Sequence, residues 1–535
     1  MPLPDLTDPP SAPKQRRRSF MDYGGPNSIN NFASSYSRAQ QYIGTSFMEQ
    51  GGEYMESPPQ IPSRPLHEDN EAFISSDDNS IRSDNNSNNQ TEHMDFPLPP
   101  PIDWSNNSVF DETSELLPTL SRVSTKRHSF SLITGNSTAA QTIFNSINTL
   151  IGIGMLSLPL GFKMSGWLFG SLLLVVSAFL TNTTAKYLGK ILYRHQELMT
   201  YGDIAYAYGG KYFLYLVTLF FVIDLFGASL TLIILFADSF TIVWPHVPAL
   251  KAIIVAVVFV LSLLPLSMLS IFSLLGIIST VGIILSVFIC GFLVDTSPGS
   301  LLIPATTTLL PPNPINLLFS LGIFMAPWGG HPVFPELYRD MRHPFKFTKS
   351  SNISFLVTYL LDFSIGATGY LMYGLMVDDS IVKSIMQNPN YPPIINSILC
   401  ILMGILPISK LPLVTKPIIT SYENIFGITA KYVKLDENGK LTDTYGPTRV
   451  FSRLLFCCVL LISALLLTSF GKLVAFLGSA ICYTVCLTLP LLFYLKLNRS
   501  SVGKLEGLLI KIGIVFSITA TILGTYASIG LTIPE

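Results

Sequence analysis

The sequence predicts an all-α polytopic membrane protein in which eleven transmembrane helices follow a long polar tail. Three observations support this class. Of the 535 residues, 49% are apolar and only 13% are charged. Residues 1–135 differ sharply in composition from the remainder, and residues 136–531 contain repeated apolar segments of the length that crosses a bilayer. The net charge of −1 provides no basic field for nucleic acid.

The predicted tail, residues 1–135, is rich in Ser, Asn, Pro and Asp. Such a segment buries too little apolar surface to offset its ordering entropy, and we expect it to be disordered. Ser19 follows three arginines, which is the pattern of a basophilic kinase site, although a solvated charge run is the alternative. Glu112, Leu116 and Leu117 resemble the acidic dileucine signal that clathrin-adaptor complexes read, a short pattern that also arises by chance.

The predicted membrane domain, residues 136–531, contains eleven apolar segments. They are about 138–162, 165–190, 212–243, 251–268, 272–294, 315–338, 351–374, 392–415, 450–469, 473–495 and 507–529. With the amino terminus in the cytosol, 21 Lys and Arg residues near the spans lie on the cytosolic side. The opposite side holds four, which are Lys163, Lys251, Lys383 and Lys472. This imbalance predicts a cytosolic amino terminus and a carboxyl terminus in the lumen or outside.

The first span has polar residues on one helical face and small residues at its centre. Gln141, Asn145, Asn148 and Gly152 are separated by four, three and four positions, so they share a face. An interrupted helix survives in hydrocarbon only beside protein or a water-filled cavity. The pattern therefore predicts a helix that opens its backbone to a ligand at mid-membrane. A close-packing face of small residues is the alternative.

The sixth span is interrupted more strongly, because prolines remove backbone donors and clash with the preceding turn. The interrupting residues are Pro327, Trp328, Gly329, Gly330, Pro332 and Pro335. Spans one and six are corresponding members of two five-span halves with opposite orientation. Paired interruptions of this kind mark the binding site of a transporter. Their half-helix ends suit a carboxylate and an ammonium, and a zwitterionic amino acid presents both groups.

Several strings in the predicted membrane domain resemble the amino acid/auxin permease family, and its branch of vesicular neurotransmitter and fungal vacuolar amino acid transporters. They are Gln141–Asn148 with Ile151–Gly154 and Leu158–Gly161, Thr200–Ala205 with Tyr208–Gly209, His331–Leu337, and Pro407–Leu411. The resemblance covers Ser137 to about Leu531. It implies a LeuT-like five-plus-five inverted repeat with an eleventh span, and proton-coupled movement of neutral amino acids. The most similar-looking members import these into the acidic vacuole in exchange for protons.

The substrate contacts are expected in the two unwound segments, chiefly through backbone groups. The residues concerned are Asn145, Asn148, Ile151, Gly152, Gly154, Ala326, Trp328 and Gly329. Of these, Asn148 and Trp328 would contribute side chains, with Trp328 as a wall for the apolar part of the substrate.

Proton coupling is expected among the ionisable residues within the spans, because such residues are costly there and usually functional. They are Asp224, Asp238, Glu336, Asp362 and Lys410. We favour Asp224, the most central, and Glu336, just beyond the second interruption; a structural salt bridge is the alternative for each. Lys410 either snorkels to the cytosolic face or acts as a tethered cation where sodium-dependent relatives bind an ion. His331 titrates in a suitable range, with a packing role as the alternative.

The sequence thus predicts a proton-coupled secondary transporter of neutral amino acids in a vacuolar, lysosome-like membrane. We expect no enzyme activity, since the carboxylates match no intramembrane catalytic arrangement, and no cofactor or metal. The six cysteines lie in or at apolar segments without zinc-ligand spacing. One alternative is a proton symporter that exports amino acids from the vacuole or acts at the plasma membrane. Another is an amino acid sensor that signals through the tail.

Overall fold

The computed structural model describes residues 135–263, 266–428, 433–435, 441–443 and 446–530, together with Ser35, Arg38 and Ala39. The structure is mostly helical, which confirms the predicted class. In the described part, nine helices are long and apolar enough to cross a membrane, and Val247–Ser262 is a shorter apolar helix. The predicted number of eleven spans and the five-plus-five inverted repeat stay predictions.

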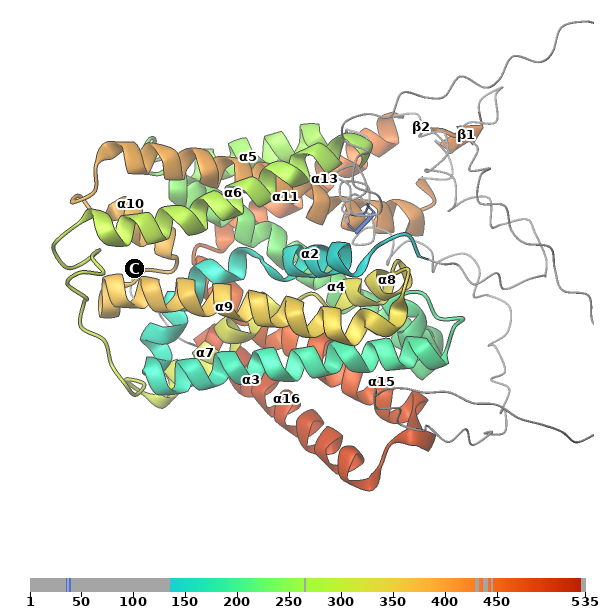
Figure 1. The fold of residues 1–535 in the computed structure, drawn as a ribbon. Coiled ribbons are helices and arrows are strands. Elements are labelled where there is room, and N and C mark those ends of the chain that lie inside the picture. Colours follow the sequence, from blue (N-terminus) through green and yellow to red (C-terminus); the bar gives the residue numbers. More distant parts are fainter. Residues whose placement is uncertain are drawn as a thin grey trace, which may run out of the picture. The chain divides into compact units, whose positions relative to one another are not determined.

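Most of the longer helices run beside one another, and α16 runs at an angle to α3 and α9 (Figure 1). They are α3 (Leu158–Arg194), α4 (Tyr201–Phe240), α6 (Leu266–Leu293), α9 (Phe347–Tyr373), α11 (Pro393–Ile425), α13 (Pro447–Leu466) and α16 (Lys504–Gly530). The shorter ones are α2 (Ala139–Leu150), α5 (Val247–Ser262), α7 (Pro314–Met325), α8 (Phe334–Arg339), α10 (Ile381–Gln387), α14 (Phe470–Phe476) and α15 (Leu489–Leu497). A π-helix, η9 (Leu477–Thr488), joins α14 to α15. Strands β1 (Val433–Leu435) and β2 (Leu441–Asp443) pair antiparallel.

Helix α3 contains the boundary between the first two predicted spans, at residues 163–164, and it has a kink just after that boundary, at Gly166. This residue has φ 71° and ψ 173°, so the helix turns there instead of running straight. A Cβ at this position would lie 2.6 Å from the carbonyl oxygen of Leu309, so glycine is required. The amides of Trp167 and Leu168, freed by the turn, donate to the carbonyl oxygens of Thr308 and Leu309, each at 3.1 Å.

An aromatic cluster around Phe162 holds α3, α7 and α9 together. Its ring lies edge-on to Phe324 of α7, with centroids 5.2 Å apart, and stacks on Tyr370 of α9 at 6.1 Å. Such pairs stabilise beyond the area they bury, by about 0.5–1.5 kcal/mol each. Helix α9 therefore packs along α3 and also along α2 (Figure 1).

A buried ionic cluster joins α11 to α13. Glu423, whose side chain is fully buried, accepts hydrogen bonds from Arg449 Nε at 3.1 Å and from Arg453 Nε at 2.9 Å. Arg453 also donates to the carbonyl oxygen of Ser262, at the end of α5. Three helices are thus fixed relative to one another by one carboxylate and two guanidinium groups.

Candidate substrate site

The first interruption lies between α2 and α3. Helix α2 begins with a capping box formed by Thr138 and Gln141. It ends at Leu150, because Ile151 (φ −71°, ψ 93°) and Gly152 (φ −112°, ψ −175°) are extended. A 3₁₀ turn, η4 (Ile153–Ser157), then leads into α3. The interruption predicted for the first span is therefore confirmed.

The second interruption lies between α7 and α8, and it too is confirmed. Helix α7 ends at Met325 and is followed by a 3₁₀ turn, η5 (Ala326–Trp328). Gly329 and Gly330 form a turn, and a second 3₁₀ turn, η6 (His331–Val333), precedes α8. Residues 326–333 thus lack regular α-helical hydrogen bonding, as their glycines and prolines predict.

The two interruptions contact one another. A Cβ placed on Gly154 would lie 3.3 Å from the backbone nitrogen of Pro327 and 3.4 Å from the carbonyl carbon of Ala326. Only a residue without a side chain lets the two chains approach this closely without displacement. The structure therefore brings the predicted contacts Gly154 and Ala326 together.

Lys410 of α11 binds the first interruption. Its Nζ donates to the carbonyl oxygen of Ile151 at 3.3 Å. That carbonyl lies in the extended segment, where no helical turn follows to supply a donor. The two roles considered for Lys410 stay predictions.

Trp328 is fully buried and forms part of the junction between the second interruption and α9. Its ring stacks on Phe355 of α9, with centroids 5.6 Å apart and planes 8° from parallel. Its indole Nε1 has no hydrogen-bond partner within the residues that the structure describes. The Trp328 ring is thus packed against Phe355, while its N–H group donates to no atom of the described residues.

Asp362 lies on the same face of α9 as Phe355. Phe355, Thr358, Asp362 and Gly366 are spaced by three, four and four positions, and Gly366 packs against Phe162. Asp362 is fully buried, and neither of its carboxyl oxygens has a hydrogen-bond partner in the described part of the chain. The same holds for Thr358 Oγ1. Helix α9, which contacts Trp328, therefore carries two buried polar groups that have no partner among the described residues.

The two carboxylates favoured from the sequence occupy other positions. Asp224 is half-buried on α4 and within electrostatic reach of Cys482 and Cys486 on η9. A Cβ at Gly329 would lie 3.3 Å from Cys482 Sγ, so η9 contacts the second interruption as well as α4. Glu336 is buried on α8. Asp362 is one of the carboxylates expected from the sequence but is not favoured there, because only the packing of α9 shows which face of the helix carries it.

His331, in the second interruption, forms hydrogen bonds with α3. Its Nε2 lies 2.9 Å from Thr184 Oγ1 and 3.1 Å from the carbonyl oxygen of Thr181. These contacts attach the second interruption to α3, and the two roles considered for His331 stay predictions.

Asn145 contacts the amino-terminal tail. Its Nδ2 donates to Ser35 Oγ at 2.9 Å and to the Ser35 carbonyl oxygen at 3.2 Å. Asn148, one turn further along α2, is half-buried. Arg38 Nε pairs with Asp340 at 3.2 Å, just beyond α8. Ser19, Glu112, Leu116 and Leu117 lie outside the described residues.

The outer ends of α2 and α8 are joined as well. Ser137 and Met341 form a parallel bridge, in which Ser137 N donates to the Asp340 carbonyl oxygen at 2.7 Å. Arg342 N donates back to the Ser137 carbonyl oxygen at 2.9 Å. The tail contacts and this bridge together join α2, the tail and the end of α8 at one end of the interrupted helices.

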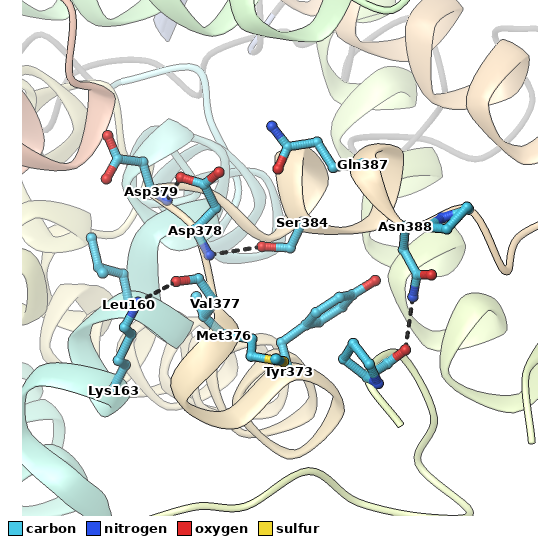
Figure 2. Close-up of a pocket in the computed structure, with 12 residues that line it drawn as sticks. Leu160, Lys163, Tyr373, Met376, Val377, Asp378, Asp379, Ser384, Gln387 and Asn388 are labelled. Atoms are coloured by element: carbon cyan, nitrogen blue, oxygen red, sulfur yellow. Dashed lines mark hydrogen bonds between the residues drawn. The ribbon is translucent and has the colours of Figure 1, made fainter. Parts of the chain in front are cut away.

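A polar pocket of about 380 Å³ lies at the other end of the helices, beside α10 (Figure 2). Its charged groups are engaged within the protein. Lys163 Nζ donates to the Val377 carbonyl oxygen at 2.6 Å, and Asp378 pairs with Lys383 at 3.0 Å. Asp379 Oδ2 accepts from Ser469 Oγ at 2.7 Å. The pocket is thus a polar recess whose charged side chains are hydrogen-bonded or paired with other groups of the protein.

A bundle of helices long and apolar enough to cross a membrane, with two interrupted helices in contact, is typical of a membrane transporter. The chain belongs to the family of transmembrane amino acid transporter proteins, which it matches over residues 135–530. This confirms the resemblance to the amino acid/auxin permeases.

Among its relatives are amino acid transporters of Arabidopsis thaliana. It is 30% identical to amino acid transporter AVT1H over 413 residues, which cover 75% of this chain and 91% of the relative. It is 28% identical to AVT1D over 403 residues, or 73% of this chain and 69% of the relative. Among solved structures, MhsT in complex with L-phenylalanine aligns with 11% identity and a TM-score of 0.43, covering 76% of this chain and 100% of that one.

Proposed function

We propose that the protein is a proton-coupled secondary transporter that imports neutral amino acids into the vacuole in exchange for protons. Membership of the amino acid transporter family supports the substrate class. The observation that carries the proposal is the contact of two interrupted helices, with Lys410 Nζ on the Ile151 carbonyl oxygen. Such interruptions provide backbone groups for both ends of a zwitterion.

In this proposal the unwound backbone of residues 150–154 and 326–330 binds the substrate's charged groups. Asn148 and Trp328 contribute side chains, and the stacked ring of Trp328 faces the apolar part of the substrate. Its unused indole donor supports a polar contact, because a buried donor without a partner costs about 1–3 kcal/mol.

We propose that one of the buried carboxylates carries the proton that is exchanged for the substrate. Asp362 becomes the leading candidate beside Asp224 and Glu336, because it is buried without a partner in the described part of the chain. An ionised carboxylate in such surroundings is very costly, and intramembrane carboxylates mark proton relays. In this scheme the ammonium group of Lys410 binds the Ile151 carbonyl oxygen permanently, at the position where sodium-dependent relatives bind an ion that can dissociate.

The energetics suit exchange against an acidic compartment. One pH unit corresponds to about 1.4 kcal/mol, which sustains about tenfold accumulation for each proton exchanged. A lumen-positive potential adds about 2.3 kcal/mol per 100 mV for a proton that leaves the lumen.

We place the amino terminus in the cytosol and the carboxyl terminus in the lumen, on the distribution of Lys and Arg. The end closed by the Ser137–Met341 bridge is then cytosolic, and the pocket beside α10 forms a luminal vestibule. Delivery to the vacuole would use the dileucine signal at Glu112, Leu116 and Leu117, read by an adaptor complex.

The proposal is tested with the full-length protein in liposomes that carry an imposed pH gradient. Labelled neutral amino acids should accumulate only when the lumen is acidic, and an uncoupler should abolish accumulation. Matched acidic and basic amino acids serve as controls for the substrate class. Release of substrate on luminal acidification would instead identify a symporter and overturn the exchange mechanism.

A second candidate function, an amino acid sensor, is favoured by one observation. Ser35 of the tail hydrogen-bonds Asn145 on the interrupted helix, so occupancy of the site and the position of the tail can be coupled. Deleting residues 1–130 distinguishes the two functions. A transporter retains uptake after the deletion, whereas a sensor loses its output.

A further inference from the structure

A second pocket, of about 420 Å³, lies at the carboxyl end of α3 and contains no residue of either interruption. We call it the α3 pocket. Its walls come from the end of α3, from Tyr338 of α8, from the segment 344–348, from Tyr494 of α15 and from the start of α16. Residues from three parts of the sequence, 186–194, 338–348 and 494–506, thus form one recess.

Three cations of α3 line this pocket from one side. Lys186, Lys190 and Arg194 are four positions apart, which places them on one helical face. Like charges at this spacing repel and disfavour the helix. The dipole at a helix carboxyl end compensates only part of this repulsion, within the last turn. Three like charges on one face of the helix therefore favour the binding of an anion beside them.

Aromatic rings position the central cation. Tyr187 and Tyr494 stack with centroids 4.1 Å apart and planes 8° from parallel. Lys190 Nζ lies 5.3 Å from the first ring centroid and 5.5 Å from the second. These cation–π contacts hold the ammonium group without neutralising it.

Glu506 is the one carboxylate among the residues that line the α3 pocket. Its Oε1 lies 3.9 Å from Lys190 Nζ, and the two side chains are 32% and 56% exposed. An exposed pair at this distance contributes little. Glu506 therefore leaves the pocket with an excess of positive charge.

The rim of the pocket suits the membrane surface. Tyr193 and Phe345 line the pocket and are 72% and 76% exposed, and aromatic residues concentrate at the interface between lipid and water. Beyond Glu506, Leu505, Leu508 and Leu509 expose apolar side chains along α16. A ligand with an anionic head and apolar chains matches both features.

We propose that the α3 pocket binds a phosphate-bearing headgroup. Lys186, Lys190 and Arg194 contact the phosphate oxygens through charge-assisted hydrogen bonds. Basic pockets between membrane helices accommodate anionic lipid headgroups in this way. The headgroup belongs to an anionic membrane lipid or to a soluble inositol phosphate, and the binding test distinguishes these sources. The proposal is independent of the direction of transport.

The test measures binding to the purified full-length protein in detergent. The probes are dioctanoyl phosphatidylinositol bisphosphate, inositol trisphosphate and dioctanoyl phosphatidylcholine. The triple variant Lys186→Ala/Lys190→Ala/Arg194→Ala should weaken binding of the phosphorylated probes at least about tenfold, since each basic residue contributes appreciably. The control variant Lys211→Ala/Lys504→Ala/Lys511→Ala removes the same charge outside the pocket and should change binding less than about twofold.

A second variant is expected to tighten binding. It therefore tests the proposal even if the triple variant folds poorly. Glu506→Gln removes the competing carboxylate and should tighten binding about two- to fivefold. Lipid binding that is much tighter than binding of inositol trisphosphate identifies a lipid ligand, and equal binding identifies a soluble one. The proposal is overturned if phosphatidylcholine binds equally well, if both triple variants behave alike, or if Glu506→Gln weakens binding.

Discussion

Lys410 and Ile151, 259 positions apart, meet where the first helix is interrupted, with the ammonium nitrogen 3.3 Å from the carbonyl oxygen. Lys410→Met keeps the side-chain volume and removes the donor. We expect transport to fall at least about tenfold and the free energy of unfolding to fall by about 1–3 kcal/mol, because the carbonyl loses its partner. Uptake into liposomes and thermal unfolding measure the two effects.

The matched control for this prediction is Lys211→Met, which removes an exposed lysine on α4. It should leave both uptake and unfolding unchanged. Normal transport by Lys410→Met would show that the contact with Ile151 has no part in the transport cycle.

Asp362→Asn tests the buried carboxyl group of α9. The amide has nearly the same shape but cannot release a proton, so accumulation driven by a pH gradient should be lost. Exchange of labelled for unlabelled substrate at equal pH should continue, because no net proton movement is needed. Comparing both assays in Asp362→Asn, Asp224→Asn and Glu336→Gln identifies the proton carrier. Full gradient-driven uptake by Asp362→Asn would exclude this residue.

Gly154→Ala tests the close contact between the interruptions. The added methyl group would lie 3.3 Å from Pro327 N and must push the two segments apart. We expect uptake to fall several-fold, with a cost of about 1–3 kcal/mol in the free energy of unfolding. Gly503→Ala is the control, since a Cβ there meets no atom within 4 Å. Equal uptake by both variants would argue against a functional contact.

The interruptions could be predicted from the sequence because glycine and proline act on the backbone locally. Pro327 and Pro332 remove donors wherever the helix packs, and Gly152 weakens the first span in the same way. The class of the protein likewise follows from composition and apolar length. These features need no knowledge of neighbouring helices.

The arrangement around the interruptions could not be predicted in the same way. Asp362 looks like one of several carboxylates within apolar helices, and only the packing of α9 against Trp328 and Phe162 shows its surroundings. The bond between Ser35 and Asn145 joins residues 110 positions apart, across a segment without any periodic pattern. Contacts of this range depend on tertiary packing, which local propensity does not encode.

Glu423→Ala tests the ionic cluster that joins α11 to α13. The substitution removes the carboxylate that Arg449 and Arg453 share, while both guanidinium groups stay buried. Removing one partner of a buried ion pair lowers the free energy of unfolding by about 3–5 kcal/mol. Thermal unfolding in detergent should show a clear loss of stability. Glu197→Ala, whose side chain is 50% exposed beside His195, is the control and should change stability by less than about 1 kcal/mol. Similar stability of the two variants would contradict a structural role for the cluster.

Arg38→Ala tests whether the tail closes the interrupted helices at their bridged end. Arg38 and Asp340 form an ion pair beside the Ser137–Met341 bridge, and the Asp340 side chain is 7% exposed. Loss of the pair should ease opening at this end, so we expect the initial rate of uptake to rise about two- to fivefold. Asp340→Asn breaks the same pair and should have a similar effect. If the two groups act through one contact, the double variant is no faster than either single variant. Additive effects would show that Arg38 and Asp340 act separately, and unchanged rates in all three variants would show that the tail does not limit opening.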